Sequence, residues 1–343
     1  IVLGIFFSLV STSLIASSKL GTNNYYFFIR HIIYIFIGLI LIIFFSAIPE
    51  KDIYKIGISI FAVFFISLLL VPFFGVEVKG SKRWLDFAIL PRFQPIEFLK
   101  PFLILSLSLV IGSRFTSNKY FKFFLSALII FPIVIVLVLQ PDLGQTLLIS
   151  CVWLSLIFVS GINLIILSFL ILFCLSIIGY VVFYLPKFSY IKQRIHSFFD
   201  TTSKGNYQSE KATEAIIDGG FFGKGIGEGT LNSRVPEAHT DYVISVISEE
   251  FGVLLILLIL TIFLTLIFRV FKKIPSEKND VNKLVLIGSI LLIIFQVLIH
   301  IGVNIRLLPT TGMTLPFLSY GGSSMLSSSI LAGLILNLTR RKI

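Results

Sequence analysis

The sequence predicts an all-α integral membrane protein with about ten transmembrane helices and one long extracytoplasmic loop between helices 7 and 8. Hydrophobic residues fill 56% of the 343 positions and charged residues only 13%, against about 45–50% and 25% in soluble domains. With a mean hydropathy of +1.01, the chain has more apolar surface than one aqueous core can bury. We therefore expect a single polytopic membrane domain over residues 1–343.

Each expected span is an apolar segment close to the roughly 20 residues that cross a bilayer as a helix. The first is interpreted as a span and not as a cleaved signal peptide, because it lacks a basic start and a small-residue cleavage site. The ten segments are 1–17, 26–48, 56–74, 96–113, 123–140, 143–160, 163–185, 240–268, 284–306 and 316–338.

Residues 186–239 form the one long polar stretch, and they are rich in glycine. Long loops in compact domains are usually functional. Within this loop, Ile191, Ile195, Phe198 and Phe199 recur at helical spacing. This pattern predicts a helix over 190–200 that lies in the membrane interface.

The balance of 28 Lys and Arg against 17 Asp and Glu gives a net charge of +11. In a membrane protein this excess indicates lipid headgroups or anionic substrates, and no basic soluble region supports a nucleic acid partner. Both cysteines, Cys151 and Cys174, lie in apolar segments, which excludes a disulfide framework.

The outer loops carry an unusual number of cations if the N-terminus is cytoplasmic. Each one can snorkel to the interface, but together they indicate a surface that binds phosphate. They are Lys79, Lys82, Arg83 and Arg92 in the loop 75–96, and Lys187, Lys192, Arg194, Lys204, Lys211, Lys224 and Arg234 in the long loop.

Two carboxylates lie where outer loops enter helices. Pro95 suits the first helical position and Glu97 the third, so Glu97 complements the helix dipole. Lys100 is three residues on, and the two side chains form either a helix-entry ion pair or part of a functional site. Asp142, in the turn QPDLGQT, is either a helix cap or a group facing the same cleft as Glu97.

The glycines of GGFFGKGIGEG, residues 219–229, allow the backbone to approach a ligand closely, and Lys224 among them is either a phosphate contact or a solvated side chain. No strand precedes this stretch, so a dinucleotide fingerprint is rejected.

In the segment 235–252, Asp241 is either an N-cap or a carboxylate at the outer boundary that acts as a base. His239 either orients it or binds substrate, or does neither.

The segment 307–325, LLPTTGMTLPFLSYGGSSM, breaks the chain between the last two spans with prolines and glycines. Irregular backbone near membrane depth occurs where protein or a water-filled cavity satisfies it. We therefore expect a cavity here. His300 is expected to hydrogen-bond a neighbouring helix, and Arg306 to snorkel.

In order along the chain, these motifs resemble those of the SEDS family, the shape, elongation, division and sporulation proteins, and look most like its division members. The resemblance covers the whole chain and implies polymerisation of lipid II into glycan strands on the outer face of the bacterial inner membrane during cell division. It is carried by GSKRW, QPIE with Lys100, QPDLG, GGFFGKGIGEG, PEAHTD, EEFG and LPFLSYGGSS.

The resemblance also implies partners and roles. The partners are lipid II, a monofunctional class B penicillin-binding transpeptidase and divisome membrane proteins. Asp241 matches the family's essential aspartate and is the expected general base in an inverting transfer. The expected substrate-binding residues are Lys82, Arg83, Glu97, Lys100, Asp142, Lys224, Glu237, His239, Thr240 and Ser319.

No metal ligand set and no cofactor is evident in the sequence, and a divalent cation, Mg²⁺ or Mn²⁺, is one option for sharing the charge of the pyrophosphate.

Two other functions stay open. The same cavity and cations suit a lipid II flippase, although the ionisable groups gather on one side. A non-catalytic divisome scaffold for a transpeptidase would need neither Asp241 nor the basic outer loop.

Overall fold

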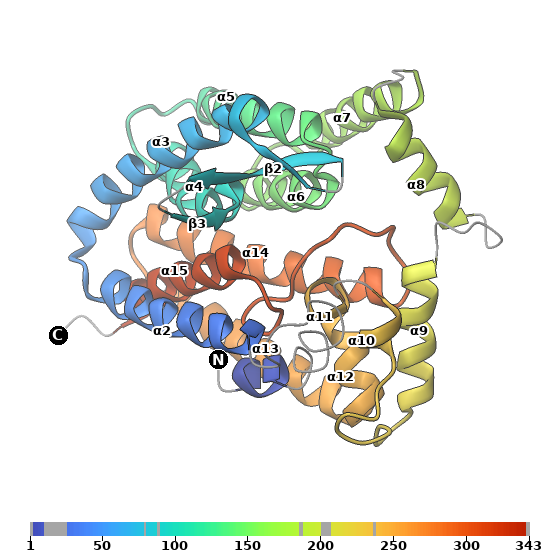
Figure 1. Ribbon diagram of the computed structural model, residues 1–343. Helices are drawn as coiled ribbons and strands as arrows, with labels where there is room; N and C mark the ends of the chain where they lie inside the picture. Colours follow the sequence, from blue (N-terminus) through green and yellow to red (C-terminus); the bar gives the residue numbers. More distant parts are fainter. Residues whose placement is uncertain are drawn as a thin grey trace. The chain divides into compact units, whose positions relative to one another are not determined.

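The computed structural model describes residues 3–9, 26–78, 80–87, 90–184, 188–199, 207–235 and 238–340. The chain divides into two compact units. One comprises Ile1–Ala47, Ser203–Lys272 and Gln296–Ile343, and the other Ile48–Thr202 and Lys273–Phe295. Each unit is described by itself (Figure 1).

The unit that contains Ile48–Thr202 is built on helices α3 to α8 and the first part of α14. Its helices begin with polar turns that precede the apolar runs; in α5 the side chain of Asn118 accepts hydrogen bonds from the amides of Tyr120 and Phe121. The bounds are α3 Glu50–Phe74, α4 Pro95–Gly112, α5 Lys119–Leu139, α6 Leu143–Val159, α7 Leu164–Tyr184, α8 Ser189–Phe199 and α14 Asp280–Asn304.

A small antiparallel sheet follows α3, so the expectation of an all-α protein is wrong at this place. The strands are β1 Val76–Val78, β2 Ser81–Phe87 and β3 Leu90–Phe93, in the order β1-β2-β3. In β2 the buried Leu85 alternates with the exposed Asp86, which is the period-2 pattern of a half-buried strand. Figure 1 shows the sheet beside α4.

The predicted helix over 190–200 is present as α8, but two of its apolar residues, Ile191 and Ile195, pack against other parts of the protein. Ile191 is buried and forms a cluster with Phe188, against Val138 and Leu143. Phe199, at the end of the same helix, is exposed. Only part of the expected stripe is therefore available to a membrane surface.

The other unit contains α2 and the C-terminal helices. Its bounds are α2 Tyr26–Ala47, α9 Tyr207–Gly219, α10 Leu231–Arg234, α11 Ala238–Asp241, α12 Val243–Phe251, α13 Val253–Phe271 and α15 Gly322–Thr339. Helix α9 packs on α12 through Ala212 and Ala215, which belong to the core around Tyr242 and Val246. Residues 3–9 are also helical.

Small residues bring α2 and α15 close together, as is common between helices in membranes. A Cβ added at Gly38 would lie 2.5 Å from the hydroxyl of Ser329, and one at Gly333 would lie 2.8 Å from Phe45. The amide of Asn337 donates to the carbonyl of Phe45 at 2.9 Å. This pair is the most extensive helix contact in the described residues.

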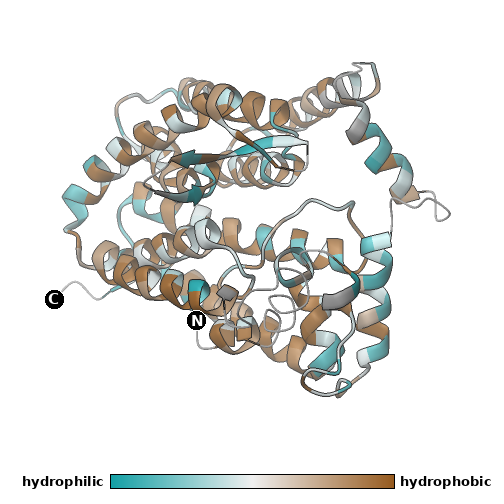
Figure 2. Ribbon diagram, in the orientation of Figure 1, coloured by the Kyte–Doolittle hydropathy of each residue, from teal (hydrophilic) through white to brown (hydrophobic). Residues whose placement is uncertain are grey.

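Seven helices in the described part of the chain are long and apolar enough to cross a membrane: Phe27–Ala47, Glu50–Phe74, Pro95–Gly112, Lys119–Leu139, Val253–Ser276, Asp280–Asn304 and Gly322–Thr339. Two shorter apolar helices match the expected spans 143–160 and 163–185. Figure 2 shows hydrophilic residues gathered on α8 and α9 and hydrophobic residues along the spans. The protein is a multi-pass membrane protein, and the count of ten helices stays a prediction.

The expected span 240–268 is not continuous. Helix α12 ends at Phe251, and Gly252, with a φ of 80°, separates it from α13. The first amides of α13 are taken by the glycine-rich loop, because Val253 donates to the carbonyl of Gly220 at 2.9 Å. The last expected span also differs, since α15 begins at Gly322 and not at 316.

Candidate functional site

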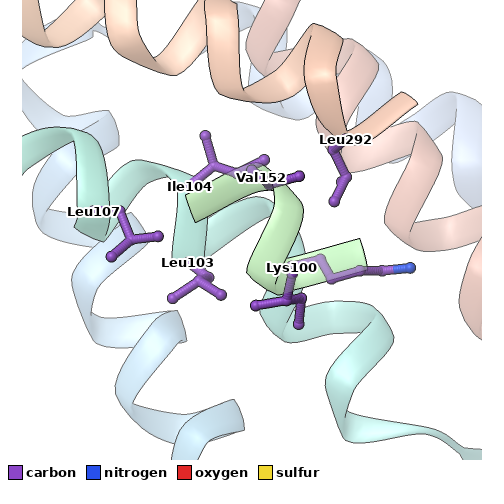
Figure 3. Close-up of a pocket in the computed structure, with 7 residues that line it drawn as sticks. Lys100, Leu103, Ile104, Leu107, Val152 and Leu292 are labelled. Atoms are coloured by element: carbon purple, nitrogen blue, oxygen red, sulfur yellow. The ribbon is translucent and has the colours of Figure 1, made fainter. Parts of the chain in front are cut away.

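The predicted contact between Glu97 and Lys100 is confirmed as a buried ion pair. Pro95 is at the start of α4 and Glu97 lies in its first turn. The ammonium of Lys100 is 2.9 Å from Oε2 of Glu97, and the side chains are 1% and 5% exposed. A small cavity borders Lys100, lined by Leu103, Ile104, Leu107, Ile149, Val152 and Leu292 (Figure 3). A charged side chain that is buried this completely strongly destabilises the fold if its oppositely charged partner is removed.

Asp142 caps α6 as predicted and also joins Glu97 in one polar network. Its Oδ1 accepts a hydrogen bond from the amide of Gln145 at 3.3 Å, and its Oδ2 accepts one from the side chain of Gln94 at 2.9 Å. The side chain of Gln145 donates to Glu97. Burial raises the pKa of Asp142, and the nearby Arg83 opposes that rise. The role of Asp142 as a cap is confirmed, and Gln145 links Asp142 to Glu97; a cleft that both carboxylates face stays a prediction.

The two adjacent cations of β2 are separated by the alternation of the strand. Arg83 donates to the carbonyl of Gln140 at 3.2 Å and to that of Pro141, and its Nε is 3.9 Å from Asp142. Lys82 is exposed and belongs to the other side of the strand. Arg83 therefore completes the α4–α6 network, which comprises Arg83, Gln94, Glu97, Lys100, Asp142 and Gln145.

Asp241 ends the short helix α11, and the alternative in which Asp241 caps the following helix is wrong. The N-cap of α12 is Tyr242, without a side-chain hydrogen bond. The backbone of Asp241 is held by Asn304, whose amide donates to its carbonyl at 3.2 Å. The Oδ1 of Asn304 in turn accepts from the hydroxyl of Ser245 at 2.7 Å. The half-buried carboxylate is thus on a fixed turn.

The irregular segment 305–321 also holds this turn, through hydrogen bonds to its backbone carbonyls. The hydroxyl of Ser319 donates to the carbonyl of Thr240 at 2.7 Å, and the amide of Tyr320 donates to the carbonyl of His239 at 3.2 Å. Gly312, with a φ of 70°, faces Asp241, because a Cβ at this position would lie 3.6 Å from Oδ2. The segment therefore lies directly beside the carboxylate of Asp241.

Helix α14 anchors the same segment through polar side chains. Nδ1 of His300 is 2.7 Å from the carbonyl of Met313, and the amide of Gln296 donates to the carbonyl of Thr314 at 2.9 Å. The partner of His300 is thus irregular backbone and not a neighbouring helix. Arg306 does not simply snorkel, because its Nη2 lies 3.7 Å from Glu210.

His239 is buried among aromatic rings. Its ring centroid lies 5.6 Å from that of Tyr320 and 5.8 Å from that of Phe27. Thr240 is half-buried beside Asp241. Glu237, another expected contact of the substrate, lies outside the described residues. We call His239, Thr240, Asp241, Asn304, Gly312 and Ser319 the Asp241 cluster.

Lys224 is placed against carboxylates of its own unit. Its ammonium is 2.8 Å from Asp218 and 3.4 Å from Glu249, and the hydrogen bond with Asp218 raises the pKa of Lys224. The surrounding glycines bring the loop against the end of α12: a Cβ at Gly223, where φ is 81°, would lie 2.2 Å from the carbonyl oxygen of Glu250. The glycines therefore allow the loop to approach the protein's own backbone at the end of α12 closely.

Two buried glutamates hold this loop, and the sequence did not predict their roles. Glu249 accepts hydrogen bonds from the amides of Thr230 and Leu231 at 3.0 and 2.9 Å, at the start of α10. Glu250 accepts one from the amide of Gly227 at 3.2 Å. Glu250 lies outside the membrane-spanning helices, and burial raises its pKa from 4.5 to about 7. In the sequence, the adjacent Glu249 and Glu250 were the feature that could have indicated these roles.

Replacing Glu250 with Gln should make stability less dependent on pH. A carboxyl whose pKa is higher in the folded than in the unfolded state binds its proton more tightly when folded, so stability falls as pH rises from 4.5 to about 7. The variant should gain up to about 3 kcal/mol above that window and nothing below it. Thermal unfolding of both proteins across this range checks this, and parallel pH profiles would contradict it.

Replacing Asn304 with Ala should lower both stability and activity. The change leaves the carbonyl of Asp241 and the amide of Ser245 without their partner, which costs about 1–3 kcal/mol for each buried group. Asn337→Ala is the matched control, because it removes another buried amide, bonded to Phe45. It should lose stability but keep the rate per folded molecule. Equal rates for the two variants would show that Asn304 does not position Asp241.

Within the described ranges, no group of three His, Cys, Asp or Glu side chains is arranged to hold a metal ion. The carboxylates that do cluster, such as Glu249, are occupied by backbone amides or ammonium groups.

Comparison with known proteins matches the whole chain to one protein family. The family model described as "Cell cycle protein", for FtsW, RodA and SpoVE, matches residues 1–343. A relative from Caulobacter vibrioides, named "Probable peptidoglycan glycosyltransferase FtsW", is 31% identical over 100% of this chain and 87% of its own. A relative of the same name from Coxiella burnetii is 33% identical over 96% of this chain and 90% of its own.

Solved structures share the fold. One, described as "Structural coordination of polymerization and crosslinking by a peptidoglycan synthase complex", has a TM-score of 0.77 and 26% identity, covering 98% of this chain and 96% of that one. The rod shape determining protein RodA of Thermus thermophilus has a TM-score of 0.68 and 24% identity, covering 98% and 95%.

Proposed function

Because the chain belongs to the FtsW, RodA and SpoVE family of cell cycle proteins, we propose that it is a peptidoglycan glycosyltransferase that polymerises lipid II into glycan strands. The observation that carries the proposal is the whole-length similarity to relatives named peptidoglycan glycosyltransferase, at 31–33% identity. The fixed turn that presents Asp241 supplies the carboxylate that this chemistry needs.

Asp241 is the general base of the proposed reaction. The acceptor is a sugar hydroxyl, a poor nucleophile until a carboxylate takes its proton. The turn that carries Asp241 is held by Asn304 and by Ser319, which limits the positions that the carboxylate can adopt. Gly312 has no side chain that would crowd it. A single base that acts opposite the leaving group inverts the anomeric centre.

The leaving group is a polyprenyl pyrophosphate, which needs positive charge more than a proton donor. Lys100 and Arg83 are the proposed cations of the α4–α6 network, and Glu97 and Asp142 orient them. Lys82 and Lys224 are proposed as outer contacts of the phosphates, with Glu237, His239 and Thr240 as further contacts of the substrate. We assign the α4–α6 network and the Asp241 cluster to one reaction on the basis of the motif resemblance, and not on the basis of their positions relative to each other.

The proposal includes a place and a partner. The proposed place of the reaction is the outer face of the bacterial inner membrane during cell division; the family description "Cell cycle protein" and the seven apolar helices support a cell cycle role at a membrane. The partner is a monofunctional class B transpeptidase within the divisome. The neighbour whose title couples polymerization to crosslinking supports such a complex.

The test is glycan synthesis from labelled lipid II by the purified full chain in lipid nanodiscs, with and without the transpeptidase. We expect polymer, and parallel reactions with Mg²⁺, Mn²⁺ and a chelator decide whether a divalent cation takes part. Lipid II movement across liposomes without polymer would favour a flippase. Normal growth with neutral variants at Asp241, Glu97 and Lys100 would favour a scaffold.

A further inference from the structure

A group of large apolar side chains is exposed at the end of α9 and in the glycine-rich loop, outside the membrane-spanning helices. Phe222 is 82% exposed, Phe221 72%, Ile217 71% and Ile226 65%. Large apolar side chains exposed this close together in the sequence indicate a surface that contacts another phase or molecule. We call Phe221, Phe222 and Ile226 the loop anchor.

The loop anchor is fastened to the beginning of a membrane-spanning helix. The amides of Val253 and Leu254, the first two residues of α13, donate to the carbonyls of Gly220 and Phe221 at 2.9 and 3.4 Å. Farther along the loop, the amide of Gly225 donates to the carbonyl of Glu250 at 3.1 Å. The loop that carries the anchor therefore lies beside the first residues of α13, a helix long and apolar enough to cross a membrane.

The face of α13 next to this end is itself apolar and exposed. Leu254, Leu257 and Leu258 are about half exposed, as expected of side chains that contact lipid. The backbone of Phe221 is next to this helix end, because its carbonyl accepts from the amide of Leu254. Phe and Leu side chains are typical of the apolar face by which an interfacial segment is buried at the boundary between headgroups and acyl chains.

We propose that Phe221, Phe222 and Ile226 insert into the outer leaflet of the bilayer and so fix the glycine-rich loop, and with it the end of α12, at the membrane surface. The occupant of this surface is lipid. Apolar burial drives the insertion, because the only cation among residues 217–229, Lys224, is already paired with Asp218 and Glu249. The insertion does not depend on the proposed glycosyl transfer.

The experiment places a spin label on the loop of the full chain in vesicles of phosphatidylethanolamine and phosphatidylglycerol. Both native cysteines, Cys151 and Cys174, are first replaced with Ser, and a nitroxide is attached at Phe222→Cys or Ile226→Cys. Glu214→Cys, on an exposed part of α9, is the matched control. Collisions with oxygen and with a water-soluble nickel chelate report the depth of each label.

Labels at 222 and 226 should lie about 5–10 Å below the headgroups and be shielded from nickel, whereas the label at 214 should be open to it. The depth should not change when phosphatidylglycerol is left out. Nickel access at 222 and 226 equal to that at 214 would overturn the proposal. It would also be overturned if shielding appeared only after the transpeptidase was added, because the surface would then bind protein.

Discussion

The Lys100→Met variant should lose both thermal stability and glycan polymerisation. Lys100 is 1% exposed and its ammonium is 2.9 Å from Glu97, so its removal leaves a carboxylate buried without its cation. Breaking such a pair from one side costs about 3–5 kcal/mol. The lost cation also removes charge that the departing pyrophosphate needs. Unfolding temperature in detergent and the rate of lipid II polymerisation measure the two losses.

A double variant separates these two effects. Lys100→Met combined with Glu97→Gln removes both charges and keeps an oxygen that accepts from Gln145. Stability should largely return, because replacing a whole buried pair is often neutral. Polymerisation should stay low, since the cation is still missing. If the double variant recovered the wild-type rate, Lys100 would be structural only.

Asp241→Asn should reduce polymerisation by about 10²- to 10⁴-fold, the usual contribution of a general base. The amide has nearly the same shape but cannot take the proton of the acceptor hydroxyl. Stability should change little, because the turn is held through the backbone carbonyls of Asp241 and Thr240. Initial rates on labelled lipid II, with Asp241→Glu as a variant that retains a base, test this. A wild-type rate in the Asp241→Asn variant would remove the assigned role.

Features that depend on neighbouring residues were predictable from the sequence. The spacing of Glu97 and Lys100 puts them on one face of α4, and the position of Asp142 before α6 makes it a cap. The apolar runs predicted the helices to within a few residues at most ends. Helices α3 and α5 begin earlier than their apolar runs, because polar turns at 50–55 and 119–122 are helical as well.

Features that depend on tertiary contacts were not predictable. At the break at Gly252, the distant loop at Gly220 accepts the first amide of α13; Glu249, Glu250 and Gly252 interrupt the apolar pattern of 240–268, but they do not identify this partner. The glycines near Lys224 suggested a ligand loop, yet they approach Glu250. Asn304 looked like an ordinary helical residue, since its contact with Asp241 joins positions 63 residues apart.

The most direct test of the central claim compares wild type and Asp241→Asn in one preparation, measuring lipid II binding and glycan products side by side. If Asp241 serves as the base, the variant should bind lipid II as the wild type does and form glycan at least about 10²-fold more slowly. Glycan formed by the variant at the wild-type rate would contradict the claim, and so would loss of lipid II binding together with loss of polymer.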